Sequence, residues 1–272
     1  MTPKVGLTIA GSDSSGGAGI QADLETFAAH GVYGTSAITA ITAQNTVGVL
    51  RTVAVDPDMV AAQVNAVLDD IPPQATKTGM LANPRVVEAV AGIAAKGMLP
   101  NLVVDPVLVS TSGHALMTDG GVQAYRDLLL PLAVLVTPNV FEAALLASVP
   151  PEELATLDAA IEVAQGLRAL GPQAVMVKGG HMGTETSADV VVTADGVVVL
   201  ERPRVPTRND HGTGCSLSAA VAAQLALGMA PLDAVERAKE YVYRALVGAA
   251  GWRLGAGHGP IDHFGWTELT PD

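Results

Sequence analysis

The only cysteine of this chain follows a short glycine-rich turn, in the segment NDHGTGCSLSAA at residues 209–220. Gly212 and Gly214 allow the backbone to curl tightly, and the alanine- and leucine-rich run 216–227 predicts a helix directly after the turn. Unpaired backbone N–H groups converge at such a helix start and attract anions, phosphate above all. An ordinary glycine turn followed by a small buried cysteine has the same pattern. Other parts of the chain must therefore decide between an anion-binding site and a purely structural turn. We call residues 211–215 the glycine turn.

A second glycine-rich segment, GSDSSGGAG at residues 11–19, lies between a predicted strand and a predicted helix. This first glycine loop lacks the Gly-Lys-Ser/Thr of a P-loop and departs from the dinucleotide-binding spacing. It is therefore either a structural turn or a loop whose backbone approaches a ligand. Asp23 follows on the helix, where its carboxylate could reach a bound hydroxyl or remain solvated near the helix start.

Polar residues also end several predicted strands. Gln44, in Gln44-Asn45-Thr46, could present a donor and an acceptor to the edge of a heterocycle, although amides at strand ends also tie down turns. Met80 closes a strand and is either a core residue or a cover for a flat ligand.

Asp105 and Asn139 follow two short apolar strands, each next to a proline. Asn139 and Glu142 are three residues apart on one helical face, where they could hold Mg²⁺ through oxygens and waters or simply cap the helix. Lys178 ends another strand, in Lys178-Gly179-Gly180-His181, and is either part of the same site or a surface lysine. The spacing of His181, His211 and His258 is not that of a metal site, so we expect polar loop residues there.

Strand-length apolar runs alternate with helical patterns along the whole chain. Asp195-Gly196, between the apolar runs 190–193 and 197–200, predicts an antiparallel hairpin. The alternation predicts an α/β fold with a mainly parallel central sheet, helices on both faces and ligands at the carboxyl ends of the strands. We expect the other strands at 4–10, 35–43, 76–80, 102–105, 134–137 and 174–178. We expect helices at 20–29, 58–68, 157–170, 216–227 and 231–250. Two further helices are expected, one beginning after Asn83-Pro84 and one following Pro138 and running through residue 147.

Composition limits the partners and the compartment. The 272 residues contain no linker-like or low-complexity segment, so we expect one domain over 1–272. A net charge of −12 argues against nucleic acid or an anionic membrane surface as a partner. The single cysteine excludes an intramolecular disulfide framework, and the sequence has neither a secretory signal pattern nor a membrane-spanning apolar run. These features predict a cytoplasmic protein.

The segments taken together resemble the hydroxymethylpyrimidine/phosphomethylpyrimidine kinases of thiamine biosynthesis, which belong to the ribokinase-like superfamily. The resemblance covers nearly the whole chain in order, and it is carried by LTIAGSDSSGGAGIQAD (7–23), ITAQNTVGV (41–49), KTGML (77–81), VVDPV (103–107), TPNVFEA (137–143), VKGGH (177–181) and HGTGCSLSAA (211–220). It implies a ribokinase-like three-layer sandwich, usually a homodimer. The implied reaction is ATP-dependent phosphorylation of 4-amino-5-hydroxymethyl-2-methylpyrimidine and then of its monophosphate.

The resemblance also implies roles for individual residues. Gln44 matches the glutamine that binds the pyrimidine, and the other positions implied for that pocket are Gly11, Ala18, Asp23, Met80 and Val107. The positions implied for ATP and its Mg²⁺ are Asn139, Glu142 and Lys178, with Asp105 and Glu142 for the metal. The anion hole at which phosphate is transferred is implied for Gly212, Thr213, Gly214 and Cys215.

Cys215 stands where the wider superfamily usually has an aspartate that acts as base. A thiol at a helix N-terminus is expected to have a lowered pKa, so a Cys215 thiolate could accept the substrate proton, or the side chain could merely shape the pocket. Asp210 replaces the threonine more common in the family and is a rival base or an exposed acid.

Two other functions remain open from the sequence. Some pyridoxine/pyridoxal kinases share this cysteine-containing turn, although the segments around Gln44 and Lys178 favour the pyrimidine. A sensor that binds a pyrimidine without catalysis would not need the glycine turn, Asn139, Glu142 and Lys178 together.

Overall fold

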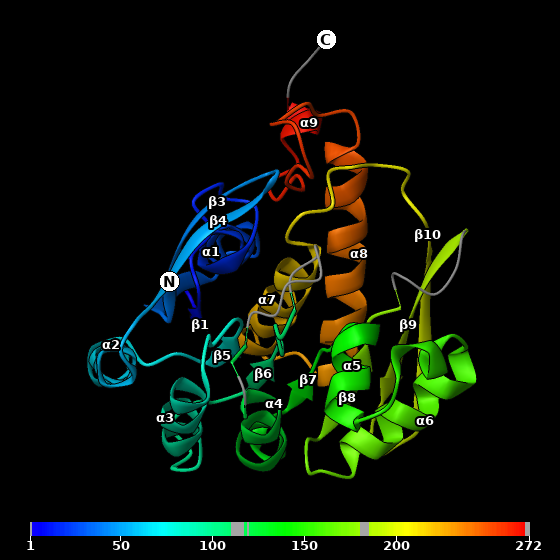
Figure 1. Cartoon of the computed structure of the whole chain (residues 1–272). Helices are drawn as coiled ribbons and strands as arrows, with labels where there is room; N and C mark the ends of the chain where they lie inside the picture. The colour runs from blue at the N-terminus through cyan, green and yellow to red at the C-terminus, as the bar shows by residue number, and fades with distance from the viewer. Residues whose placement is uncertain (1, 110–116, 119, 180–184, 270–272) are drawn as a thin grey trace.

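The computed structural model describes residues 2–109, 117–118, 120–179 and 185–269, and its elements alternate between strands and helices (Figure 1). The strands are β1 (Val5–Ala10), β2 (Tyr33–Ile38), β3 (Ala40–Asn45), β4 (Gly48–Ala54), β5 (Ala75–Thr78), β6 (Leu102–Val104), β7 (Leu135–Val136), β8 (Ala174–Val177), β9 (Thr186–Val192) and β10 (Val197–Pro203). The α-helices are α1 (Gly19–Ala29), α2 (Pro57–Asp70), α3 (Pro84–Ala94), α4 (Gly121–Ala124), α5 (Val140–Ala147), α6 (Leu157–Arg168), α7 (Thr213–Ala226), α8 (Pro231–Ala249) and α9 (Trp266–Leu269). A π-helix (Tyr125–Leu129) and two 3₁₀ turns (Leu130–Leu132 and Pro151–Leu154) complete the list.

The main sheet has eight strands in the order β10-β9-β8-β7-β6-β5-β1-β2. Neighbouring strands from β2 to β8 run parallel, whereas β9 is antiparallel to both β8 and β10. The α/β class, the mainly parallel sheet and the antiparallel β9–β10 hairpin are therefore confirmed. Because the parallel strands all end at one edge, their following loops meet there.

Side chains alternate between the two faces of this sheet. Leu7, Val104 and Val136 belong to a core shared with α2, α3, α5 and α6, whereas Val103 and Leu135 belong to a second core with α1, α7 and α8. The period of two in a strand produces this alternation. Figure 1 shows α7 and α8 side by side on the second face.

The predicted strand 35–43 is wrong, because the chain changes sheets at Thr39. β2 pairs with β1 as far as Ile38, opposite Ala10, where β1 ends. Thr39 then donates from its N–H to Ala10 O and from its hydroxyl to Met80 O, at 3.0 and 2.5 Å. β3 continues instead into an antiparallel ribbon with β4, a strand that the sequence pattern did not predict.

Helix α1 is held against the sheet by Phe27, which is fully buried. A side chain on Gly6 would begin 3.0 Å from the Phe27 ring, and one on Gly34 would begin 3.2 Å from it. Glycine at these two strand positions therefore leaves the space that the ring fills. This packing fixes the end of the first glycine loop, since α1 begins at Gly19.

Phe27→Ala is expected to lower the free energy of unfolding by roughly 3–5 kcal/mol, because it opens a cavity under α1. Urea denaturation measures this loss. Phe141→Ala is the matched control, since Phe141 is 45% exposed and should cost clearly less. Equal losses for the two variants would contradict the role given to Phe27.

Candidate active site

The glycine turn forms the beginning of α7, three residues earlier than the sequence predicted. Gly212 precedes the helix with a φ of 81°, and Thr213, Gly214 and Cys215 make its first turn. A side chain on Gly212 would clash with the carbonyl oxygen of Gly17. The glycine turn and the first glycine loop therefore meet backbone to backbone, and the N–H groups at the start of α7 lie beside that contact.

Asp105 is buried, and its carboxylate accepts hydrogen bonds from three other segments of the chain. Its Oδ1 accepts hydrogen bonds from Lys178 Nζ at 2.8 Å and from Thr137 Oγ1 at 3.3 Å, and its Oδ2 accepts one from Ser218 Oγ of α7 at 3.2 Å. These partners come from the ends of β8 and β7 and from α7. Predicted neighbours at the strand ends are thus brought together around one carboxylate.

Lys178 is a largely buried residue, not a surface lysine. It is 14% exposed, and its Nζ would lie 3.2 Å from a side chain on Gly214. Burial lowers the pKa of Lys178, but Asp105, Glu142 and Cys215 outweigh that effect and the pKa is raised, so its ammonium stays charged. The structure therefore places a permanent cation beside the first turn of α7.

Asn139 and Glu142 form a helix capping box. The Asn139 N–H donates to Glu142 Oε2 at 2.8 Å, and the Glu142 N–H donates to Asn139 Oδ1 at 2.9 Å. The capping alternative considered for this pair is thus observed. Burial raises the pKa of Glu142 to about 7, with Lys178 acting against the rise and Asp105 adding to it.

Asp23 has a different place from the one the sequence suggested. Its carboxylate is fully buried, with Lys77 Nζ at 2.9 Å from both oxygens and Thr8 Oγ1 at 2.6 Å. It is not a solvated helix-start acid, because both oxygens face buried donors. Burial raises the pKa of Asp23, although Lys77 and Thr8 act against the rise.

Lys77 is a residue that the sequence reasoning missed. Burial lowers its pKa, yet Asp23, Cys215 and Asp105 outweigh that effect and raise it. The available signal was a lysine in the middle of a short strand, β5. All four residues of β5 are buried, and a buried charge requires a partner of opposite charge.

Gln44 contacts the glycine turn at His211, whereas Lys178 approaches the turn at Gly214. A β-bulge between Ala43 and Gln44 shifts the register of the ribbon and redirects the side chain. The amide nitrogen of Gln44 lies 3.2 Å from His211 Nε2, in the glycine turn. His211, predicted to be only a polar loop residue, is therefore part of the site.

The remaining predicted pocket residues lie along the same strand ends. A side chain on Gly11 would clash with the terminal methyl of Met80, so these two positions touch. The Ala18 N–H donates to Asp13 Oδ2 at 2.9 Å, and the Val107 N–H donates to the Asp105 carbonyl oxygen at 2.9 Å. His181 lies outside the described residues.

Asp210 is an exposed acid, paired with His258. Its Oδ1 lies 2.6 Å from His258 Nδ1, and the two side chains are 50% and 66% exposed. A carboxylate so exposed and so paired does not resemble a base held against a buried substrate.

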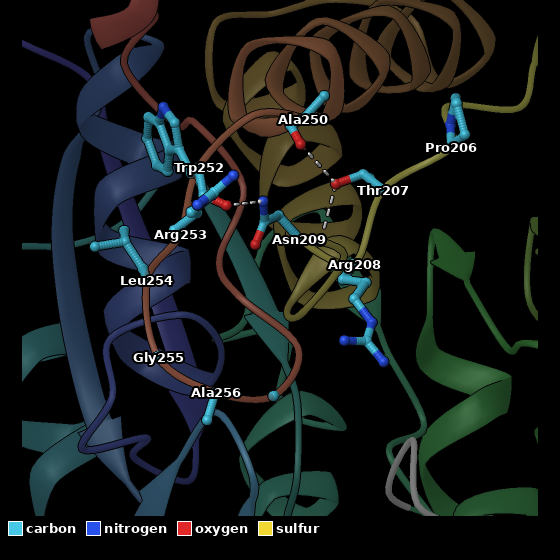
Figure 2. A pocket seen from close by; sticks show the side chains of 11 residues that line it. Pro206, Thr207, Arg208, Asn209, Ala250, Trp252, Arg253, Leu254, Gly255 and Ala256 are labelled. Atoms are coloured by element: carbon cyan, nitrogen blue, oxygen red, sulfur yellow. Dashed lines mark hydrogen bonds between the residues drawn. The ribbon is translucent and has the colours of Figure 1, made fainter.

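A hollow of about 610 Å³ lies next to the segment that leads into the glycine turn. Its walls are residues 206–209 and the loop after α8, which Figure 2 shows tied together. Asn209 Nδ2 donates to the Trp252 and Ala249 carbonyl oxygens at 3.0 and 2.7 Å. None of the predicted catalytic or binding residues lines this hollow, and the Asn209 contacts tie the segment before the glycine turn to the loop after α8.

Comparison with known proteins identifies the family. The family described as phosphomethylpyrimidine kinase matches residues 13–262. A hydroxymethylpyrimidine/phosphomethylpyrimidine kinase from Synechococcus elongatus is 48% identical over 265 residues, covering 97% of this chain and 98% of that protein. This chain belongs to the phosphomethylpyrimidine kinase family.

Two solved structures and a plant relative are also similar to most of this chain. The phosphomethylpyrimidine kinase of Clostridium difficile superposes with a TM-score of 0.78 at 40% identity, covering 89% of this chain and 99% of that one. An ADP complex of Bacillus subtilis pyridoxal kinase gives 0.88 at 39% identity, covering 99% and 100%. The chloroplastic thiamine biosynthetic bifunctional enzyme of Arabidopsis thaliana is 45% identical over 272 residues, covering 99% of this chain and 51% of that protein.

In this kinase, the expectation of a lowered pKa for Cys215 is wrong. Burial raises the pKa of the thiol to about 11, and the nearby carboxylates of Asp105 and Asp23 add to the rise. Lys77 and a hydrogen bond from the Gly19 N–H act against it without reversing it. The helix start was the only influence visible in the sequence, whereas burial and the two acids come from the tertiary structure.

Two further observations concern metals and membranes. Within the described part of the chain, no group of three or more His, Cys, Asp or Glu side chains is placed to hold a metal ion. In the same residues, no helix combines the length and apolar character needed to cross a membrane.

The thiol of Cys215 is expected to remain protonated at neutral pH and to ionise only near pH 11. Ultraviolet thiolate absorbance, followed during a pH titration, measures this step, and the chain has no other cysteine to interfere. Cys215→Ser provides the baseline, because it leaves the tyrosines that also ionise at high pH. A thiolate signal that appears between mildly acidic and mildly alkaline pH would contradict the assignment.

Proposed function

We propose that this enzyme transfers the terminal phosphoryl group of ATP first to the hydroxyl of 4-amino-5-hydroxymethyl-2-methylpyrimidine and then to the resulting monophosphate. The observation that carries the proposal is the position of the glycine turn. Its residues contact Gln44 on one side through His211 and approach Lys178 on the other through Gly214. A heterocycle held at Gln44 and a phosphate chain held at Lys178 would meet at the start of α7.

The phosphate end of this site is suited to charge stabilisation. Phosphoryl transfer depends mainly on in-line placement and on neutralising charge on the transferring group. The N–H groups of Thr213, Gly214 and Cys215, at the positive end of α7, would stabilise that charge, and Lys178 would add a fixed cation. We assign these four residues to the transfer step, with Gly212 allowing the turn.

Cys215 acts in this proposal as a neutral thiol. A loose transition state needs little help from a base, because the attacking oxygen has formed only a weak bond when the leaving group departs. A thiol with a pKa of about 11 is a poor proton acceptor at neutral pH. Its suggested role is to fill the space between the glycine turn and the substrate.

Mg²⁺ fits the oxygen groups at this edge of the sheet. Asp105 and Glu142 are buried, and burial, with a further contribution from the charge of Asp105, raises the pKa of Glu142. These two carboxylates would hold a divalent cation, whose charge would offset that effect. Two carboxylates make an incomplete shell, and ATP oxygens and waters would complete it. The bound ion would neutralise charge on the phosphates, while Asn139 holds the backbone at the start of α5 for Glu142.

The pyrimidine end is assigned to Gln44, to Gly11 and Met80, whose positions touch each other, and to Ala18 and Val107 in loops. Asp23 supports this region from below through Lys77. We further propose that the 272 residues form one cytoplasmic domain that pairs with a second copy. The exposed apolar side chains on the β3–β4 ribbon, Ile41, Val49, Leu50 and Val53, support the pairing.

Measuring ADP release with the pyrimidine, its monophosphate and pyridoxine in parallel tests the function. We expect turnover with both pyrimidines that depends on Mg²⁺. Turnover with pyridoxine should be roughly 10–100-fold less efficient, since a few unmade hydrogen bonds separate the substrates. The similarity to pyridoxal kinase makes this arm necessary. Faster turnover with pyridoxine would favour vitamin B6 salvage, and absence of turnover with all three would favour a sensor.

Lys178→Met is expected to lower kcat by about 10²–10³-fold, because it removes a fixed positive charge next to the transferring phosphate. Steady-state kinetics measures the change, and thermal unfolding measured in parallel reports the loss of the Asp105 ion pair. Lys96→Met is the matched control, because Lys96 is an exposed lysine outside the site. A kcat within twofold of the unaltered enzyme would refute the role of Lys178.

A further inference from the structure

His211 lies between two side chains that are distant from it in sequence. Its Nε2 is 2.8 Å from Asp13 Oδ2 and 3.2 Å from the amide nitrogen of Gln44. Asp13 comes from the first glycine loop, Gln44 from the end of β3, and His211 from the glycine turn. Asp13 and His211 are 2% and 13% exposed, so water competes little for these contacts.

The surrounding backbone is shaped for this arrangement. A side chain on Gly17 would begin 2.7 Å from His211 Cδ2, so the glycine leaves space for the imidazole ring. The His211 N–H donates to the Gly259 carbonyl oxygen at 3.0 Å. Asp13 is fixed in turn by the Ser15 and Ala18 N–H groups at 2.8 and 2.9 Å. The imidazole and the carboxylate therefore have little freedom to rearrange.

The position of the proton on the His211 ring follows from the charge of the Asp13 carboxylate. Burial by itself raises the pKa of Asp13, but hydrogen bonds from His211 and Ser15 outweigh it, and the pKa is lowered. The carboxylate is therefore ionised at neutral pH and requires a proton on His211 Nε2. The single Nε2–H donates to Asp13 Oδ2 at 2.8 Å and, in a three-centre arrangement, also faces the Gln44 amide at 3.2 Å.

A donor on His211 selects one orientation of the Gln44 amide. The amide nitrogen carries only donors, so its placement beside Nε2–H brings two donors together. A 180° rotation of the terminal amide exchanges nitrogen and oxygen at nearly the same positions, and the oxygen can then accept from Nε2–H. The amide N–H groups then lie on the side of the amide that faces away from His211 Nε2.

We propose that Asp13 and His211 are positioning residues for substrate recognition, which hold the oxygen of the Gln44 amide toward His211 and its N–H groups toward the bound heterocycle. This inference rests on the proposed contact between Gln44 and the pyrimidine. The orientation suits a substrate that offers an unprotonated ring nitrogen as an acceptor. Because His211 directly precedes Gly212, the same contact ties the recognition of the heterocycle to the glycine turn.

The test is a double-mutant cycle between His211→Gln and Gln44→Ala, with pyrimidine binding measured by calorimetry without ATP. We expect each single variant to weaken binding about tenfold, the effect of losing one well-made hydrogen bond. The double variant should bind as Gln44→Ala does, because His211 acts through Gln44. ATP binding, measured by calorimetry without the pyrimidine, and thermal unfolding are followed in parallel, because a general structural defect would weaken both, whereas loss of positioning at Gln44 would not.

Asp13→Asn provides a second route if His211→Gln folds poorly, since it keeps the shape of the side chain and removes the charge that fixes the imidazole proton. It should also weaken pyrimidine binding, and again without further effect in Gln44→Ala. His258→Gln is the matched control, because His258 also pairs with an aspartate near the glycine turn but is 66% exposed. Its pyrimidine binding should be unchanged.

Two results would overturn the inference while leaving the function intact. They are additive losses in the double variant, and a fall in kcat with unchanged pyrimidine binding in His211→Gln. Unchanged binding in Gln44→Ala would overturn the inference together with the proposed pyrimidine site. The ADP-release assay tests the phosphoryl transfer itself, so failure of the kinase function is seen separately.

Discussion

The buried carboxylate of Asp105 is the interaction on which the arrangement of the site depends. A carboxylate that is 1% exposed is costly to keep charged unless donors surround it, and here they come from the ends of β7 and β8 and from α7. Satisfying this one group draws Lys178, Thr137 and Ser218 to a common point. The same charge also influences the pKa of Glu142, Lys77 and Cys215.

A second constraint is the contact between the two glycine-rich segments. Gly212 has a positive φ and no room for a side chain against the Gly17 carbonyl oxygen, so glycine is required for two reasons at once. This close approach lets His211 reach both Asp13 and Gln44. The first glycine loop, the end of β3 and the glycine turn are therefore parts of one packed unit, and the proposed transfer requires them in register.

The electrostatics of the site favour fixed charges over mobile protons. Lys178 stays protonated beside Asp105 and Glu142, and Cys215 stays neutral because burial and two acids oppose its ionisation. Such a site can stabilise negative charge on phosphate without reorganising during the reaction. It is less suited to removing a proton, which agrees with a transfer that requires little base assistance.

The sequence by itself determined the α/β class, the order of most elements and the antiparallel hairpin, because periodicity and turn residues are local signals. It also identified the glycine turn, since a glycine-rich helix start is encoded in consecutive residues. Only the tertiary structure decided that the chain changes sheets at Thr39, where β1 ends and offers no further partner. It likewise decided the burial of Asp23 against Lys77, the raised pKa of Cys215 and the contact of His211 with Gln44, because each depends on charges or space supplied by residues far away in the chain.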